Sequence, residues 1–326
     1  MNDILWKQEL NGNDAGEAGF VEKIKTTTIE SAYKDTATVR CWNQAPPCGK
    51  DACYVPITND NLQVMNGQYE NDVHKLINFD MYWNNVDSRH CGLFRKVNNN
   101  LTIEHLTLRH VQSESAPDAF TGALVGSVTN QAATLNVNNV HVEGKCVING
   151  GAAAAGGLIG HTNGAVSVMQ SDIANAIVTS TGNSGGLIGE TGDGVTNIKE
   201  VSCDGEMSVK GKNASGGIIG QTNQAKVTVD TAKFLSKVEV TSDNTHAGGI
   251  IGISGGEAEI KNTTFSGRLS VNGANSSGGI IGNANGKVTV DRITFDSDVT
   301  VTATSANVHA GGIVGYANGK ADINNI

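Results

Sequence analysis

One short glycine-rich motif recurs along the chain at nearly constant spacing. Gly-Gly-Leu/Ile-Ile/Val-Gly occupies residues 156–160, 185–189, 216–220, 248–252, 278–282 and 311–315, and a variant occupies 122–126. From Gly126 onward the closing glycines are 34, 29, 31, 32, 30 and 33 residues apart. This period, with small changes in length, indicates one structural unit per repeat, with insertions confined to turns.

Between the glycine motifs, apolar residues alternate with polar ones. After Gly282 the apolar positions are Val288, Val290, Ile293, Phe295, Val299 and Val301, and after Gly220 they are Val227, Val229, Ala232, Phe234, Val238 and Val240. A period of two places alternate side chains on one face of a strand. The pattern predicts an all-β parallel solenoid (β-helix), with about three short strands per coil of roughly 31 residues. Like side chains would stack at about 4.8 Å, and parallel crossovers favour a right-handed coil.

Composition and charge fit this architecture and narrow the possible partners. The chain has 41 Gly, 4 Pro and 5% aromatic residues, a mixture that suits short strands and tight turns. The net charge is -9 without a basic run, which argues against a nucleic-acid partner. No stretch approaches the ~20 apolar residues of a membrane helix, so we expect no membrane insertion by this segment.

The N-terminal part lacks the repeat. Residues 1–54 contain no glycine motif, and we expect them to cap the open first coil, because bare strand edges invite pairing. A separate small domain is the alternative. Residues 55–326 would then form the solenoid. The stop in mid-repeat at Ile326 suggests a fragment of a longer chain, and the first residues lack the features of a secretion signal.

Two sets of residues are predicted to form the turns of the solenoid. A solenoid corner needs positive φ or close backbone approach, and glycine permits both. The turn glycines are Gly92, Gly157, Gly186, Gly217, Gly249, Gly279 and Gly312. Three residues after the closing glycine stand Asn163, Asn223, Asn285 and Asn318, with Gly192 and Gly255 in other repeats. Asn and Gly both tolerate the left-handed conformation, so this column predicts a turn residue. A stacked Asn ladder and a ligand-binding Asn row are the alternatives.

The six cysteines fall into two groups. Cys146 and Cys203 lie in inward columns two coils apart, where free thiols behave as small apolar residues. The others are candidates for structural disulfides that staple the cap in an exported protein: Cys41, Cys48, Cys53 and Cys91. Four cysteines allow three connectivities. A zinc site is a rival that the C-x6-C-x4-C spacing fits poorly, and reduced structural thiols are a third possibility.

An ordered series of short motifs precedes the regular repeats. Tyr54-Val55-Pro56-Ile57 leads to Asn71-Asp72, then to Cys91-Gly92-Leu93-Phe94, and then to the alternating run 101–108. This order resembles the opening of GLUG-motif repeat proteins, although Tyr54 replaces a Trp and Arg95 replaces the last glycine of the motif. Members of that family are mostly large bacterial surface or secreted proteins, including adhesin-like ones. The resemblance implies an extracellular or cell-surface location and a scaffold or binding role, with no catalytic residue and no cofactor.

The sequence contains no H-E-x-x-H and no phosphate-loop motif. We therefore expect no enzyme activity, no cofactor and no metal. The favoured function is a stalk or adhesive segment that binds a protein or glycan through loops on one edge of the stack. Those loops are 149–155, 180–184, 211–215, 241–247, 272–277 and 302–310. His246 and His309 would lie in them as solvated side chains.

Two alternative functions share the predicted fold. A carbohydrate-active β-helix enzyme would gather carboxylates at neighbouring coil positions, whereas here Asp and Glu differ from coil to coil. An ice-binding solenoid would present a regular outward row of Thr. The outward row here consists of Asn136, Ser167, Asn197, Thr228, Glu259 and Thr289. Its charge and irregularity argue against ice binding.

Overall fold

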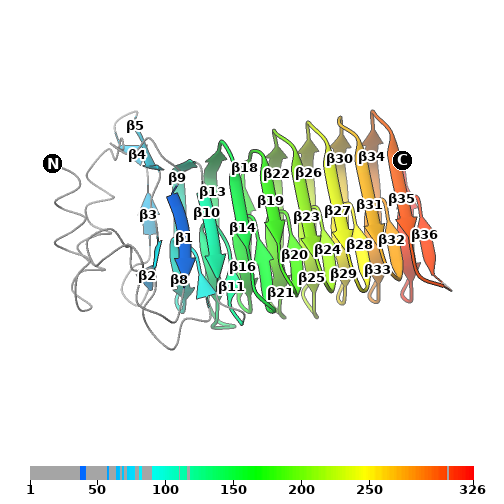
Figure 1. Cartoon of the computed structure of the whole chain (residues 1–326), viewed down its shortest axis with the longest axis horizontal. Helices are drawn as coiled ribbons and strands as arrows, with labels where there is room; N and C mark the ends of the chain where they lie inside the picture. Colours follow the sequence, from blue (N-terminus) through cyan, green and yellow to red (C-terminus); the bar gives the residue numbers. More distant parts are fainter. Residues whose placement is uncertain are drawn as a thin grey trace.

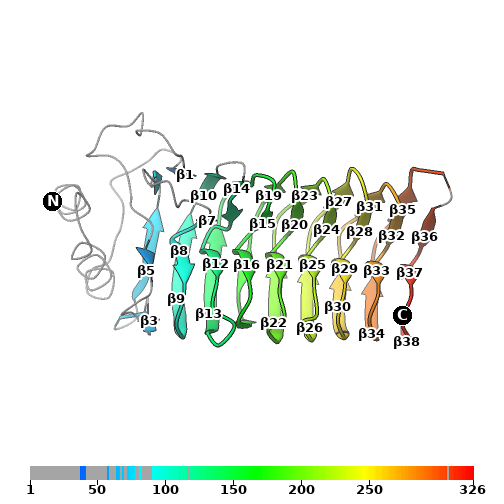
Figure 2. The ribbon, with the colours of Figure 1, turned by 90° about the horizontal axis from the view of Figure 1, so that it is seen from below.

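A computed structural model shows the chain wound into a rod of stacked coils (Figures 1 and 2). It describes residues 90–326, except 110, 116–117 and 307, and several strands nearer the N-terminus. Those strands are β1 (Ala37–Cys41), β2 (Ile57–Thr58), β3 (Val64–Asn66), β4 (Gln68–Tyr69), β5 (Asp72–Ile77) and β6 (Met81–Tyr82). The regular structure of the described residues is entirely β, and strands of successive coils pair in parallel, as predicted.

One coil contains a long strand followed by three shorter ones. The long-strand sheet contains β9 (Leu101–Arg109), β13 (Thr134–Glu143), β17 (Ala165–Met169), β18 (Asp172–Ile173), β22 (Thr196–Cys203), β26 (Val227–Phe234), β30 (Ala258–Phe265), β34 (Val288–Phe295) and β38 (Ala321–Asn324), with β3, β4 and β5 at its start. The flank sheet contains β10 (Val111–Ser115), β14 (Cys146–Asn149), β19 (Ala176–Thr179), β23 (Met207–Gly211), β27 (Val238–Ser242), β31 (Leu269–Gly273) and β35 (Val299–Ala303), with β1 and β6.

Two further sheets come from the glycine motif. Inner sheet 1 contains β7 (His90–Cys91), β11 (Phe120–Thr121), β15 (Ala154–Gly156), β20 (Asn183–Gly185), β24 (Ala214–Gly216), β28 (His246–Gly248), β32 (Ser276–Gly278) and β36 (His309–Gly311). Inner sheet 2 contains β2, β8 (Phe94–Val97), β12 (Val125–Val128), β16 (Ile159–Thr162), β21 (Ile188–Thr191), β25 (Ile219–Thr222), β29 (Ile251–Ser254), β33 (Ile281–Ala284) and β37 (Val314–Ala317).

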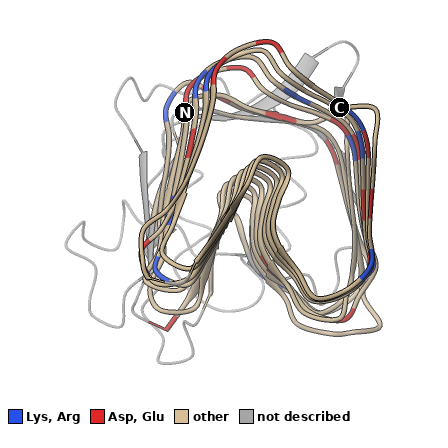
Figure 3. Cartoon of the chain, turned by 90° about the vertical axis from the view of Figure 1, so that its right-hand side faces the viewer, with Lys and Arg blue, Asp and Glu red and all other residues tan. Residues whose placement is uncertain are grey.

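The prediction of about three strands per coil was wrong, because the described coils have four, or five where the long strand is divided into β17 and β18. The first two predicted strands are one continuous strand, such as β26, and the glycine motif adds two of its own, such as β28 and β29. Viewed along the rod, the chain folds inward toward the middle of each coil (Figure 3). The cross-section is therefore indented rather than triangular.

From Asn139 onward, one residue with positive φ bends the chain in or beside the long strand of each coil. These residues are Asn139, Gln170, Glu200, Thr231, Asn262, Arg292 and Asn325, with φ between 48° and 62°. The predicted Asn/Gly column does lie at a turn, after the strands of inner sheet 2, but among the described residues none of its asparagines or glycines has positive φ. They extend the ladder instead, since the backbone N–H groups of Asn223 and Asn285 donate to Thr191 and Ser254 at 2.9 and 2.8 Å.

The core is a set of stacked side-chain columns. The rings of Phe234 and Phe265 stack with centroids 4.5 Å apart, and those of Phe265 and Phe295 with centroids 5.3 Å apart. The alternating positions Val227, Val229, Ala232, Phe234, Val238 and Val240 are all buried. The predicted register of equivalent residues is therefore confirmed.

The second glycine of each motif lies at the inner turn between the two inner sheets. Its φ is not positive in any coil, since Gly144 is the positive-φ glycine of the described part. The requirement is close approach: a Cβ on Gly249 would lie 2.0 Å from the carbonyl oxygen of Gly279 in the next coil. Gly157, Gly186, Gly217 and Gly279 meet the next coil in the same way, at 2.0–2.1 Å, and Gly92 meets the amide nitrogen of Gly126 at 2.7 Å. Gly312 has no atom within 4 Å of such a Cβ.

The predicted cap lies mostly outside the described residues. Its one described strand, β1, pairs in parallel with β10 and with β6. Residues 37–41 therefore belong to the flank sheet, although they precede the predicted boundary at residue 54. A strand from the segment predicted to form the cap is therefore part of the flank sheet.

Candidate functional site

The predicted recognition loops connect the flank sheet to inner sheet 1, so they lie along one edge of the stack. They are shorter than expected, because each ends in a strand of inner sheet 1. Their exposed tips differ from coil to coil: Ala152, Thr181, Lys212, Asn213, Asp243, Asn244, Asn275 and residues 304–306. We call this row the loop edge.

Backbone hydrogen bonds tie the loop edge together from coil to coil. The N–H group of Asn213 donates to Gly182 at 3.0 Å, that of Asn244 to Lys212 at 2.9 Å, and that of Asn275 to Thr245 at 2.8 Å. Lys210 also forms an ion pair with Asp243, with the atoms 3.2 Å apart. The tips therefore keep fixed positions relative to one another, and a ligand that spans several coils would not have to order them.

A second row of residues, most of them polar, lies where the two inner sheets face each other, and we call it the polar seam. Inner sheet 1 contributes the first residue of each strand: His90, Phe120, Ala154, Asn183, Ala214, His246, Ser276 and His309. Inner sheet 2 contributes the residue after each closing glycine: Ser127, His161, Glu190, Gln221, Ile253, Asn283 and Tyr316. From Phe120 and Ser127 onward, the two members of a pair are seven positions apart in sequence.

Glu190 is the centre of a hydrogen-bond network in the seam. Its carboxylate accepts from the side-chain amides of Asn183, at 3.0 Å, and Asn223, at 3.1 Å. Asn223 accepts from the amide of Gln221 at 2.9 Å, and Asn183 accepts from the backbone N–H of Ala214 at 3.2 Å. Asn223 of the predicted Asn column therefore joins neighbouring coils through side chains. The arrangement is a local polar network and not the uniform Asn ladder that was one alternative.

An aromatic stack occupies the N-terminal end of the polar seam. The rings of His90 and Phe120 stack with centroids 5.2 Å apart, and those of Phe120 and His161 at 4.2 Å. His161 also lies 3.2 Å from the hydroxyl of Ser127 and is 8% exposed. Burial lowers the pKa of His161, against the opposing effect of the Glu190 carboxylate. Burial therefore favours the neutral form of this imidazole.

The two histidines predicted to be solvated loop residues lie in strands. His246 begins β28 and is partly buried, with its Nε2 atom 3.3 Å from the amide nitrogen of Asn283. Burial lowers the pKa of His246. His309 begins β36 and is exposed, and its ring lies 5.0 Å from that of Tyr316. The prediction of a solvated side chain was thus wrong for His246.

His161 and His141 are expected to give opposite pH dependences of stability. The hydrogen bond to Asp172 raises the pKa of His141 above 6.5, so its contribution is full below pH 6.5 and is lost as pH rises through the folded pKa. The lowered pKa of His161 makes the folded state lose stability as pH falls from 6.5 toward that pKa. Urea denaturation from pH 8 to 4.5 measures both.

His161→Gln should flatten the acid limb of this profile, and Asp172→Asn should remove the gain that His141 gives near pH 6.5. His309→Gln, at an exposed position, is the matched control. A His161→Gln profile that superimposes on that of the wild type would contradict the assignment.

The described cysteines fall into the two predicted groups, buried free thiols and disulfide candidates. Cys146 and Cys203 are free and buried, and burial raises the pKa of each thiol to about 12. Cys91 is disulfide-bonded, and its Sγ atom accepts a hydrogen bond from Ser113 at 3.4 Å. The side chains of Cys41, Cys48 and Cys53 lie outside the described residues, so the connectivity stays a prediction.

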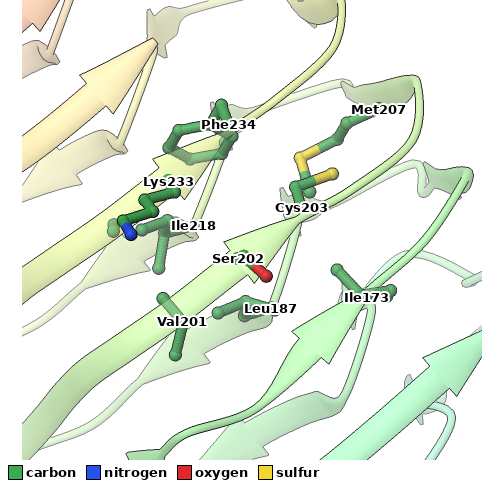
Figure 4. Close-up of a pocket in the computed structure, with 11 residues that line it drawn as sticks. Ile173, Leu187, Val201, Ser202, Cys203, Met207, Ile218, Lys233 and Phe234 are labelled. Atoms are coloured by element: carbon green, nitrogen blue, oxygen red, sulfur yellow. The ribbon is translucent and has the colours of Figure 1, made fainter. Parts of the chain in front are cut away.

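A small apolar cavity lies in the core beside Cys203 (Figure 4). The side-chain column that contains Phe234 continues into the preceding coils with Cys203 and then Ile173. The smaller side chains leave a gap that Met207 and Leu187 also line. We attribute the cavity to this change in side-chain volume, and its apolar lining is typical of a dry packing defect.

The charged residues of the described coils lie mainly on the outer contour of the cross-section rather than on its inward fold (Figure 3). No group of three or more His, Cys, Asp or Glu side chains that could hold a metal ion gathers among the described residues. The same part of the chain contains no helix long and apolar enough to cross a membrane.

The sequence reasoning missed the polar seam. Its signal is present: variable residues flank each glycine motif seven positions apart, as in Asn183 and Glu190. The pattern is visible only once the motif is known to fold back on itself, which brings its two flanks together.

The geometry defines the class of this protein as a parallel β-solenoid with four sheets and a glycine-lined inner turn. No family model, no curated protein and no solved structure matches the chain.

Proposed function

We propose that this chain is a non-enzymatic stalk or adhesive segment of a larger secreted or cell-surface protein, of the GLUG-motif type. It binds a protein or glycan through the loop edge. The observation that carries the proposal is the loop edge itself: its exposed tips differ from coil to coil, while backbone hydrogen bonds join one coil to the next.

The stacked coils also suit a spacer. Equivalent residues of adjacent coils lie about 4.8 Å apart, and every coil hydrogen-bonds to its neighbours through four sheets. A rod of this kind holds binding tips at fixed intervals and transmits their position along its length. An extended ligand that contacts several tips would gain affinity from this preorganisation.

The test is to apply the purified chain to arrays of glycans and of extracellular proteins. For a ligand that binds, we expect the triple variant Lys212→Ala, Asp243→Ala, Asn244→Ala to weaken affinity at least tenfold, because these tips are exposed and adjacent. The matched control is Lys199→Ala with Thr228→Ala and Glu259→Ala on the outer face of the long-strand sheet.

Equal losses in the two variants would reject the loop edge as the binding surface. Absence of binding to both arrays would leave the spacer role and reject the adhesive one. Turnover of a polysaccharide by the wild-type chain would favour the carbohydrate-active alternative instead.

A further inference from the structure

In the coil that contains β18 and β19, the corner between the long-strand sheet and the flank sheet is one residue shorter than in the coils on either side. Three residues separate the aligned inward positions Val142 and Cys146 in the coil before it, and residues 204–206 separate Cys203 from Met207 in the coil after it. Only residues 174–175 join β18 to β19. This coil is also the shortest repeat, at 29 residues between closing glycines. The row of corners therefore has a notch at this coil.

The sheet opens at the notch. Cys146 pairs with Ala176, and Met207 pairs with Val238, at the start of their strands. The pairing between β19 and β23, which lie side by side (Figure 1), begins one residue later, with Ile177 opposite Ser208. One ladder pair is therefore lost at this position, while the corner itself stays in contact, since a Cβ on Gly205 would lie 2.6 Å from the backbone nitrogen of Asn175.

A surface pocket occupies this position. Its apolar floor includes Ile177, whose side chain is 36% exposed, and the buried Met207. Lys145 lies on one wall, and Glu206 and Ser208 lie on the other. Lys145 and Glu206 belong to coils two steps apart, which places their backbones about 10 Å from each other.

Opposite charges face the pocket from its two walls. The other charged residues at its rim, Lys237 and Glu239, form an ion pair at 2.6 Å with each other. Within the described part of the chain, neither Lys145 nor Glu206 takes part in an ion pair. Their charges are therefore available to a ligand.

We propose that this notch binds a carboxylate-bearing sugar residue of an acidic glycan. The C–H face of its pyranose ring packs on the exposed side chain of Ile177. Lys145 donates to the sugar carboxylate in a charge-assisted hydrogen bond. Glu206 accepts from ring hydroxyl groups, and Ser208 can donate or accept. The site is separate from the loop edge and adds a ligand class to the proposed adhesive role.

The test measures binding of three probes to the full chain by saturation-transfer NMR and calorimetry. A galacturonic acid trimer and sialyllactose carry the carboxylate from two different sugars, and lactose is the neutral comparison. We expect at least one acidic probe to bind and lactose to bind at least tenfold more weakly. Equal binding of all three, or binding of neither acidic probe, would overturn the proposal.

Two variants locate the site. Lys145→Ala should weaken the acidic probe about tenfold, whereas Lys199→Ala, at an exposed lysine on the long-strand sheet, should leave its affinity unchanged. Insertion of one glycine between Ala174 and Asn175 restores the three-residue corner and should abolish binding. Circular dichroism and thermal melting check that each variant is folded. Unchanged affinity in Lys145→Ala would refute the assignment.

These outcomes are separable from those of the proposed function. An array ligand that binds the loop edge while both acidic probes fail would leave the adhesive role intact and remove the notch as a sugar site. Binding of an acidic probe at the notch without any array ligand at the loop edge would support the notch as a sugar site and remove the loop edge as a binding surface.

Discussion

Gly249→Ala should destabilise the chain by about 3 kcal/mol or more, as overpacking against rigid backbone does. A Cβ there would lie 2.0 Å from the carbonyl oxygen of Gly279 and 3.1 Å from its carbonyl carbon. These are backbone atoms, so relief requires the next coil to move away. That movement stretches the hydrogen bonds on both sides of the inner turn, including the bond from Gly249 N–H to Gly278 O at 3.2 Å.

Gly312→Ala is the matched control, because it makes the same change where no atom lies within 4 Å of the new Cβ. Neither glycine has positive φ, so alanine should fit the backbone at 312 and stabilise it by about 0.5 kcal/mol through the unfolded state. Urea denaturation of both variants gives the comparison. Equal effects would show that close approach between coils is not the reason for the glycine.

Phe265→Ala should cost about 3–5 kcal/mol, the usual range for truncating a buried phenylalanine. Its side chain is 1% exposed and stacks on both sides, with ring centroids 4.5 Å from Phe234 and 5.3 Å from Phe295. The substitution removes two ring contacts and leaves a cavity between coils that the backbone ladder holds at fixed spacing. Hydrogen exchange should show the largest loss of protection in β26, β30 and β34.

Phe295→Ala provides the internal comparison, since Phe295 is only partly buried and stacks on one described phenylalanine. We expect it to cost about half as much in urea denaturation. Because each coil contacts mainly its neighbours, the Phe265 variant should also unfold less cooperatively than the wild type. A Phe265→Ala loss below that of Phe295→Ala would contradict the column model.

The repeat predicted the fold well where one physical rule decides the outcome. Alternation with period two places Val238 and Val240 on the buried face, and the constant spacing places Phe234, Phe265 and Phe295 in one column. Both features depend on local strand geometry and on identical neighbours above and below. The structure confirms both.

The sequence was less informative about turns. Asn163 and Asn223 suggested a left-handed turn because their side chain tolerates it, yet the positive φ occurs at positions as varied as Thr231, Glu200 and Arg292. The left-handed conformation costs each of those residues about 1–2 kcal/mol. It is adopted because the bend keeps the next inward side chain on the core side. Residue preference is weak where the packing of the whole coil sets the backbone angle.

The sequence by itself therefore determined that the chain stacks in coils, which side chains face inward, and that glycine is required once per inner turn. Only the tertiary structure decided that the glycine motif folds into the middle of the coil as two strands. It also decided that Asn183 meets Glu190 across the polar seam, and that the short corner at Ala174 and Asn175 opens a notch. Periodicity is a property of neighbours along the chain, whereas these three features depend on contacts between segments whose relative direction no local pattern specifies.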